Sequence, residues 1–478
     1  MTERSLQAIP AALLALALAA CGSGGGGSSG GGASGAAAST ATTATAQVFF
    51  AGAGAVDITP PPGAPLAGFG AAPRREINAF TIPLQVLAAL NTSCYRPNPS
   101  SITTFFAPAT GKLDPIMAKA LVLSNGATKM AIIKLDMIGS NRQIRDDLEP
   151  VAISLGIPAE NFLICSTHTH SGPGALSKQK LWELLAADCY NDGLYQRVRM
   201  GIEQALRDAD AGLRPATIGI GTMNEANASH NRRGRTGIYD TELGLVKVVD
   251  AGGNAIAAWL NFAVHGTALG GSNMLYSADV MGVCEREIEQ QLGGVAIFTN
   301  GAEGDVAPAN GLASGSVLAQ DVLGLWPSVA MKPWVYLAGA FTDITLPNPT
   351  VNTGCFPIPG GNQTICDIIP GFAIQIPFNR SWISEKGPFQ ALRVDRTVFA
   401  GCPGEPITEV GWDIKARGLA KGFDHTFVLG LANDHLAYFA TEAQYIKAEY
   451  EGQSTLFGPH TDLMVEQAAD GVMDRVKP

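Results

Sequence analysis

The chain has 478 residues, of which 46% are hydrophobic, so it is long enough to bury a large core. Its formal net charge is -10 and it contains no block rich in Lys and Arg, which argues against nucleic acid or an anionic membrane surface as a partner.

The N-terminal residues predict a lipoprotein signal peptide at positions 1–20. An apolar run begins at Ile9 and is shorter than the about 20 residues that span a bilayer. Leu18–Cys21 has the lipobox pattern, so we expect Cys21 to be lipidated and the exported protein to be anchored to the bacterial cell envelope, at the outer membrane. Residues 21–46 are almost entirely Gly, Ser, Ala and Thr, the composition of a flexible tether. The alternative is an ordinary signal peptide with a chance cysteine.

Residues 47–478 are predicted to form one α/β domain with a mixed sheet flanked by helices. Apolar runs rich in β-branched residues predict the strands, and amphipathic periodicity predicts the helices. In chain order these are strands 121–123 and 130–138 around an Asn125–Gly126 turn, helix 141–155, strand 162–165, helix 194–209, strands 243–249 and 255–264, helix 280–292, strand 295–298, strand 396–399, a helix near Ala416, strand 426–431 and helix 463–476. Residues 311–380 are rich in Pro, Gly and aromatic residues, which predicts an inserted loop region.

Cysteine usage gives one predicted disulfide. Beyond Cys21 the number of cysteines is odd, so they cannot all pair. Cys355 and Cys366 flank a short loop rich in Pro and Gly, and export places the chain in an oxidising compartment, so we predict that these two pair. The pairing of the others stays open. The sequence contains no CxxC, which argues against a zinc site built from thiolates.

Three histidines follow two predicted buried strands. His168 and His170 come after the strand that ends at Cys165, in a loop rich in Gly, Ser and Pro, and His265 directly follows strand 255–264. In extended backbone, residues two apart point to the same side, so the first two imidazoles are expected to face one cavity. A lone histidine is more often a core or surface residue, but three beside glycine-rich loops predict a zinc site.

Six segments resemble motifs of the neutral ceramidases, and they occur in the order of that family. They are Thr167–Pro173, Asn261–Thr267, Ser277–Gly282, Gly304–Val306, Pro403–Glu405 and Tyr450–Thr461. Val56–Pro61 and the following Gly68–Gly70 are similar to the first strand and loop of the family. The resemblance covers essentially the whole chain after the tether.

The resemblance implies a set of zinc ligands. The first histidine of the THTH motif corresponds to His168, and the histidine before Gly-Thr corresponds to His265. The glutamate of the Pro-Gly-Glu motif corresponds to Glu405, and a tyrosine upstream of the last motif corresponds to Tyr438. Without the resemblance, Tyr438 would be assigned to the core.

The resemblance also implies four catalytic residues. His170 is expected to face the substrate carbonyl and to help hold the developing oxyanion, with Tyr450 as a second donor. Arg232 matches an arginine near the site, although it also fits a solvated loop charge. Asp305 matches the aspartate of the family, and Asp305 or Glu303 is expected to act as a general base or to orient a water. The alternative interpretation of Glu303 is an exposed loop acid.

Two departures from the family bear on the activity. Ala307 stands where the family has its nucleophilic serine, and loss of a catalytic serine costs roughly a millionfold in kcat in the best-studied case. A zinc-bound water with a pKa lowered to about 7 would need no serine. The chain also stops soon after His460, so we expect it to lack the C-terminal β-sandwich domain of the family.

These observations predict a zinc-dependent hydrolase of an N-acyl bond in ceramide or a related acyl amide. The alternatives are a catalytically degenerate lipoprotein that retains zinc and binds a ligand, and a zinc esterase or lactonase. The sequence does not give the oligomeric state.

Overall fold

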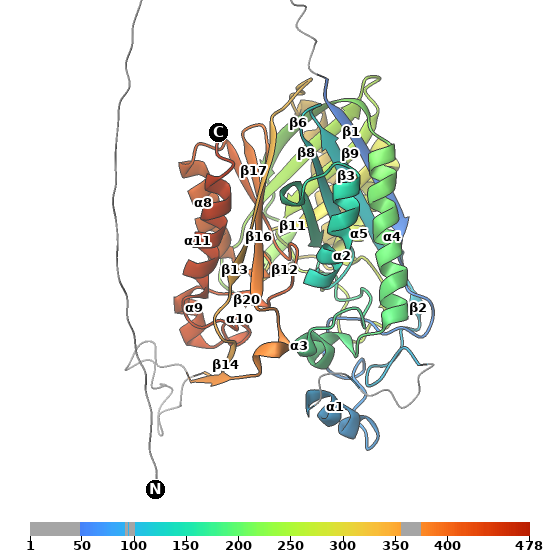
Figure 1. Ribbon diagram of the computed structural model, residues 1–478, viewed down its shortest axis with the longest axis vertical. Helices are drawn as coiled ribbons and strands as arrows, with labels where there is room; N and C mark the ends of the chain where they lie inside the picture. The colour runs from blue at the N-terminus through green and yellow to red at the C-terminus, as the bar shows by residue number, and fades with distance from the viewer. Residues whose placement is uncertain (1–47, 91–93, 95–100, 355–373) are drawn as a thin grey trace, which may run out of the picture. The chain divides into compact units, whose positions relative to one another are not determined.

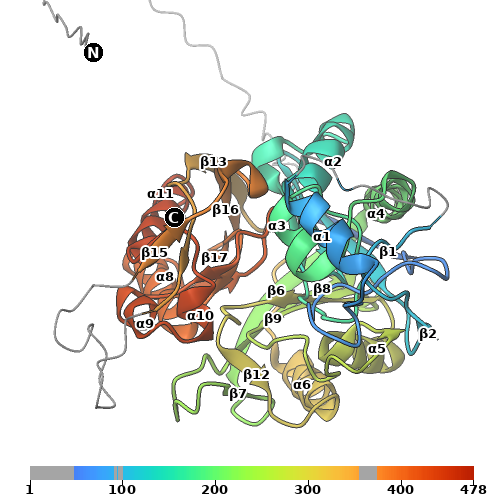
Figure 2. The same ribbon diagram turned by 90° about the horizontal axis from the view of Figure 1, so that it is seen from below.

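In this protein, helices and sheets stack in four layers (Figures 1 and 2). The computed structural model describes residues 48–90, 94, 101–354 and 374–478. The predicted signal peptide, the tether and the Cys355–Cys366 disulfide lie outside the described residues. Residues 47–478 form one compact unit. No helix in the described ranges is long and apolar enough to cross a bilayer.

The large sheet has eight strands in the order β11–β9–β8–β6–β1–β3–β4–β5 (Figure 1). In chain order these are β1 (Phe50–Asp57), β3 (Met117–Ser124), β4 (Lys129–Leu135), β5 (Phe162–Ser166), β6 (Arg214–Asn224), β8 (Glu242–Asp250), β9 (Ala255–Phe262) and β11 (Val295–Asn300). The pairs β4–β5 and β9–β11 are parallel and the other neighbours are antiparallel, so the sheet is mixed, as predicted.

A second sheet packs against the first. It consists of β13 (Leu337–Thr345), β16 (Lys386–Val394), β17 (Thr397–Gly401) and β19 (His425–Leu429), in that order. One hydrophobic cluster holds buried residues from both sheets, and within it the Trp259 ring stacks on Phe399 at 4.0 Å. The predicted inserted region contributes β13, which is an edge strand of this sheet.

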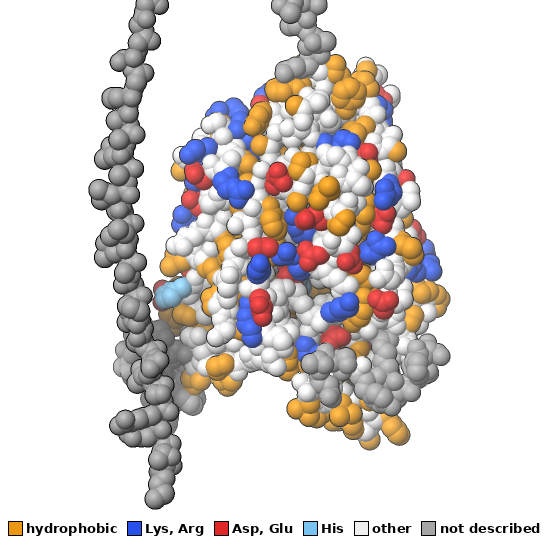
Figure 3. All heavy atoms as spheres, viewed as in Figure 1, with side chains coloured by type: hydrophobic (Ala, Val, Ile, Leu, Met, Phe, Trp, Pro, Cys, Tyr) orange, Lys and Arg blue, Asp and Glu red, His pale blue; other side chains and the backbone are white. Residues whose placement is uncertain are grey.

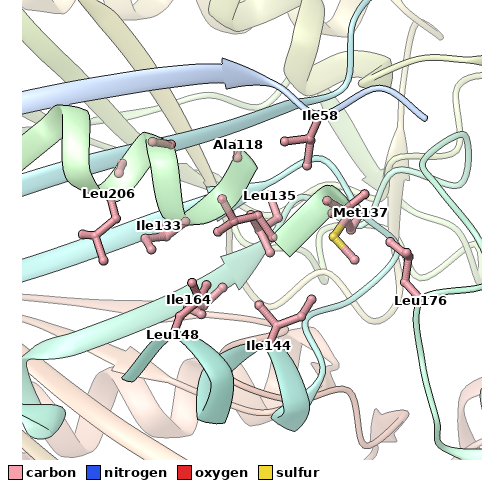
Figure 4. Packing of buried hydrophobic residues seen from close by; sticks show 14 of the residues in the cluster. Ile58, Ala118, Ile133, Leu135, Met137, Ile144, Leu148, Ile164, Leu176 and Leu206 are labelled. Atoms are coloured by element: carbon pink, nitrogen blue, oxygen red, sulfur yellow. The ribbon is translucent and has the colours of Figure 1, made fainter. Parts of the chain in front are cut away.

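Helices cover the outer face of each sheet. The large sheet is covered by α2 (Arg142–Ser154), α4 (Asp192–Ala211), α5 (Asp279–Leu292) and α6 (Ala313–Leu325), and the small one by α8 (Thr408–Ala420) and α11 (Thr461–Asp474). Figure 4 shows Leu148 of α2 and Leu206 of α4 packed near Ile133 and Ile164 of the strands. The mixed α/β class predicted from the sequence is therefore confirmed.

The shorter elements join these layers. They are α1 (Thr81–Leu90), β2 (Gly111–Lys112), α3 (Lys180–Trp182), β7 (Ser229–Asn231), β10 (Leu275–Tyr276), β12 (Val306–Pro308), β14 (Thr350–Asn352), β15 (Gln375–Pro377), β18 (Glu405–Pro406), β20 (Tyr438–Phe439), α9 (Glu442–Lys447) and α10 (Tyr450–Gln453). A π-helical turn spans 183–187.

Local sequence signals explain several boundaries. The β3–β4 hairpin closes at the predicted turn, where the Asn125 side chain accepts from the backbone N–H of Thr128 at 2.8 Å and Gly126 adopts a positive φ. Asn141 caps α2 by accepting from the N–H of Ile144 at 2.9 Å, and Asn191 caps α4 in the same way.

A disulfide joins Cys94 to Cys189, 95 residues apart. It was not predicted, because sequence spacing does not show which distant segments meet. The loop that it closes is long, so the chain-entropy estimate gives a stabilisation of about 4.7 kcal/mol. Cys165, Cys284 and Cys402 are buried free thiols.

A network of charged side chains is buried beneath α5. Lys134 on β4 lies 2.7 Å from Asp136 and 2.8 Å from Glu285, and the Lys134 and Asp136 side chains have no exposed surface. Lys119 contacts Glu285 at 2.9 Å and Glu289 at 2.7 Å. Burial acts to lower the pKa of Lys134, but the two carboxylates outweigh it and raise that pKa above its ordinary value. The lysine is therefore charged inside the protein.

Candidate metal centre

The candidate site is built from three units in which strands and helices follow one another in the same order. Each has an antiparallel hairpin, a helix and a strand parallel to the second hairpin strand: β3–β4–α2–β5, β8–β9–α5–β11 and β16–β17–α8–β19. Loops after the parallel strands are where α/β proteins place functional groups. The segments after these strands carry His168 after β5, His265 after β9, Glu303 after β11, Glu405 (the first residue of β18) after β17 and His435 after β19.

Backbone carbonyls orient two of the histidines. His168 Nδ1 lies 2.5 Å from the carbonyl oxygen of Ile138, and His265 Nδ1 lies 2.7 Å from that of Glu303. A carbonyl only accepts, so each Nδ1 carries the proton and each Nε2 presents its lone pair. Burial and the Arg232 charge lower the pKa of His265 to about 3, which keeps this ring neutral.

Both Nε2 atoms face one carboxylate oxygen. Glu405 Oε2 lies 3.2 Å from His168 Nε2 and 3.3 Å from His265 Nε2. The Tyr438 hydroxyl lies 3.2 Å from His265 Nε2, and the parallel pairing of β18 with β20 sets Tyr438 beside Glu405. The structure thus brings together all four side chains that the sequence predicted as ligands.

This arrangement fits a cation. The Glu405 side chain is buried among these groups, at 2% exposure. Its Oε2 atom is buried without a hydrogen-bond partner and is surrounded by atoms that present lone pairs. A buried charge left in this state is costly. Two imidazole nitrogens, a carboxylate and a phenol oxygen make a donor set that suits Zn²⁺.

His435 fixes the other oxygen of the same carboxylate. Its Nε2 lies 2.9 Å from Glu405 Oε1, and its ring stacks on Trp182 at 4.0 Å with the planes 10° apart. Gly139 permits this packing, because a Cβ there would lie 2.5 Å from His435 Nδ1. The sequence reasoning missed His435, although it follows a predicted strand just as the other histidines do.

We expect His435→Phe to weaken zinc binding by tenfold to a hundredfold, which is typical when an outer-shell partner of a ligand is lost. Phenylalanine keeps a ring against Trp182 but gives Glu405 Oε1 no donor. Competition against a fluorescent chelator measures the affinity. His425→Phe, at the start of β19, is the control and should leave the affinity unchanged. Equal affinity in both variants would show that His435 does not orient Glu405.

His170 lies on the cavity side of the cluster. Its Nε2 is 3.2 Å from His168 Nε2, and its ring lies 4.8 Å from Phe69. The two histidines converge, but not by strand alternation as predicted, because His168 has a left-handed φ of 65°. Gly68 at φ +118° leaves room for His170, since a Cβ there would lie 2.8 Å from the histidine Cβ.

Arg232 and Tyr450 line a cavity of about 760 Å³. Arg232 donates to the Tyr438 hydroxyl at 3.1 Å and to Glu451 at 2.9 Å, and its guanidinium lies 5.2 Å from the centre of the Tyr450 ring. The interpretation of Arg232 as a solvated loop charge is therefore wrong. The cavity is lined by Gly68–Gly70, His170, Arg232, Arg233, Thr267, Tyr438 and Glu449–Glu451.

Comparisons with known proteins point to one family. Residues 108–316 match the family model for the N-terminal part of the neutral/alkaline non-lysosomal ceramidases. This chain is a relative of the neutral ceramidases. It is 23% identical over 389 residues to the neutral ceramidase of Pseudomonas aeruginosa, covering 64% of this chain and 58% of that protein. The corresponding protein of Mycobacterium tuberculosis is 25% identical over 390 residues, covering 63% of this chain and 61% of its own length.

Solved structures show the same fold. The crystal structure of neutral ceramidase from Pseudomonas aeruginosa superposes with a TM-score of 0.72 at 19% identity, over 90% of this chain and 74% of that one. A structure described as ceramidase complexed with C2 gives a TM-score of 0.71 at 20% identity, over 90% and 75%. This chain spans about three fifths of the length of the curated neutral ceramidases that it matches.

The loop after β11 differs most from its predicted role. Glu303 is fully buried rather than exposed, and burial and nearby Glu405 raise the pKa of its carboxyl well above the ordinary value. Asp305 accepts from Asn231 at 2.7 Å and from both the N–H and the hydroxyl of Thr408, so its carboxylate ties this loop to its neighbours. Ala307 lies on β12, opposite His230 of β7.

Proposed function

We propose that this chain is a zinc-dependent hydrolase of N-acyl bonds that acts on ceramide or a related acyl amide. One observation carries the proposal: the Nε2 atoms of His168 and His265 converge on a buried Glu405 oxygen that has no hydrogen-bond partner. The relationship to neutral ceramidases supports the reaction class. His168, His265, Glu405 and Tyr438 are the proposed ligands.

Zinc in this position would act as a Lewis acid and would lower the pKa of a bound water to about 7, which supplies a nucleophile without a serine. Arg232 holds the Tyr438 oxygen in place. His170 and Tyr450 line the cavity, where their N–H and O–H groups can donate to the oxygen of a tetrahedral intermediate. The carbonyl oxygen of Glu303 accepts from His265, and Asp305 holds the loop that contains this carbonyl. We propose that Asp305 acts by positioning this loop.

A second candidate is a zinc-retaining lipoprotein that binds an acyl ligand without hydrolysis. Ala307 favours it, since this position offers no nucleophile. Attachment through Cys21 to the cell envelope is part of both proposals.

The test uses the full-length chain with Cys21→Ser, which removes the proposed lipidation site. Bound zinc is quantified by mass spectrometry, and release of fatty acid is followed with a fluorescent N-acyl sphingosine, with and without a chelator. We expect one zinc per chain and release that the chelator abolishes. Stoichiometric zinc without release from any acyl amide would favour the second candidate.

The variant Ala307→Ser separates the two candidates further. If a water is the nucleophile, serine adds nothing, so we expect the rate to stay the same or to fall. Steady-state kinetics on the same amide measure this. Activity that appears in Ala307→Ser when the parent is inert would instead identify the native protein as a degenerate relative.

A further inference from the structure

An apolar surface is exposed on helix α1 and the residues that lead into it. Ile77, Phe80, Ile82, Val86 and Leu90, here called the α1 patch, have side chains 48–84% exposed. Positions 82, 86 and 90 recur at helical spacing and share one face, whereas Thr81 and Ala88 are buried on the other. None of residues 77–90 is charged. Figure 3 shows hydrophobic side chains along the lower edge, where α1 lies in Figure 1.

Hydrogen bonds and packing fix the start and the inner side of α1, while the side chains of the α1 patch are exposed. Asn78 accepts from the N–H groups of Phe80 and Thr81 at 2.9 and 3.0 Å, which fixes the start of the helix. Ala88 packs into a small cluster with Phe105 and Phe106. The exposed side chains are thus displayed by an anchored element.

A short segment that precedes the α1 patch connects it to the wall of the cavity. Gly68–Gly70 line the cavity, and Arg75, just before the patch, donates to the carbonyl oxygens of Gly70 and Leu185. Leu185 is itself 53% exposed. A second apolar prominence, the β14–β15 ribbon with exposed Val351 and Ile376, lies at the same end of the molecule as α1 (Figures 1 and 2).

These features favour a lipid bilayer as the occupant. An uncharged, anchored helix face that is linked through Arg75 to the cavity wall fits insertion into the boundary between headgroups and acyl chains, where apolar side chains are buried by about 5–10 Å. Single exposed apolar residues need no explanation, but a contiguous patch marks an interaction site. With no Lys or Arg in 77–90, the attraction is apolar and needs no anionic lipid.

We propose that the α1 patch docks on the surface of a lipid bilayer and sets the cavity mouth against it, so that an acyl amide can pass from the bilayer into the site. The substrate part of this inference rests on the proposed function. The docking is separate from the anchor at Cys21, because it belongs to the folded domain.

The test measures binding of the full-length chain with Cys21→Ser to vesicles of phosphatidylcholine, by flotation. Val86→Asp places a charge in the α1 patch at a side chain that is 53% exposed. Ile153→Asp does the same on α2, at a side chain that is 55% exposed. Because burial of one large apolar side chain is worth at least tenfold in partitioning, we expect Val86→Asp to lower vesicle binding at least tenfold and Ile153→Asp to leave it unchanged.

A hydrolysis assay separates this inference from the proposed function. Both variants should hydrolyse a soluble short-chain acyl amide at the parental rate, and only Val86→Asp should lose activity on the amide embedded in vesicles. Equal vesicle binding by the two variants would overturn the docking, as would a parent that does not float. A change from dimer to monomer in Val86→Asp, with vesicle binding unaltered, would assign the patch to a second copy. Absence of hydrolysis by every form would count against the proposed function alone.

Discussion

We expect His265→Ala to abolish zinc binding and hydrolysis together. The side chain is fully buried, its Nε2 lies 3.3 Å from Glu405 Oε2, and its loss leaves three of the four proposed ligands. The affinity should fall by more than the about hundredfold that loss of an outer-shell partner costs. Zinc content after dialysis and the rate on an acyl amide are the two measurements.

The control for this change is His425→Ala. His425 is also a histidine that stacks on an aromatic ring, in this case Phe427, and it begins the strand whose far end leads to His435. This variant should keep both zinc and activity, and its unfolding temperature measures the cost of a lost imidazole alone. Full zinc occupancy in His265→Ala would refute the proposed centre.

We expect Lys134→Met to destabilise the protein by about 3–5 kcal/mol, because its removal leaves the buried Asp136 carboxylate without a cation. Glu285 would keep Lys119 at 2.9 Å, so the loss falls on Asp136. The methionine chain fills a similar volume, so the loss reports on charge rather than on a cavity. Unfolding in urea, followed by circular dichroism, gives the free energy.

Lys129→Met is the matched control on the same strand. Lys129 pairs with Asp210 at 2.7 Å, but both side chains retain access to solvent, at 24% and 18%. An ion pair of this kind is worth about 1 kcal/mol or less. Equal losses in the two variants would contradict the view that burial of the network sets its contribution.

The order of strands and helices could be predicted because apolar runs and caps are local signals. The strands around Asn125–Gly126 and the helix after Asn141 appear as the sequence suggests. His168 and His265 could be selected because each follows a buried strand. Glu405 also follows a predicted strand, but the strand-end argument was applied only to histidines, and Tyr438 stands in the apolar run Leu436–Ala440, which suggests a core residue. Only the family resemblance pointed to these two.

Glu303 and His435, which lie near the proposed ligands, were not identified correctly from the sequence. Glu303 lies between two loop glycines, Gly301 and Gly304, which suggests exposure, but Gly430 packs so closely that a Cβ there would lie 2.4 Å from the Glu303 carboxyl. Only the tertiary fold reveals that cover. His435 was within reach of the sequence, because the strand-end argument used for His168 applies equally to β19.

The disulfide between Cys94 and Cys189 has a consequence for how the protein is produced. It ties the chain after α1 to the start of α4 and holds none of the four proposed ligands. Thiols stay reduced in the bacterial cytosol, whereas the periplasm oxidises them. Material made in the cytosol would therefore lack this link between α1 and α4, and with it a stabilisation of about 4.7 kcal/mol. The unfolding temperatures of material from the two compartments would then measure how much of the domain's stability depends on this one bond.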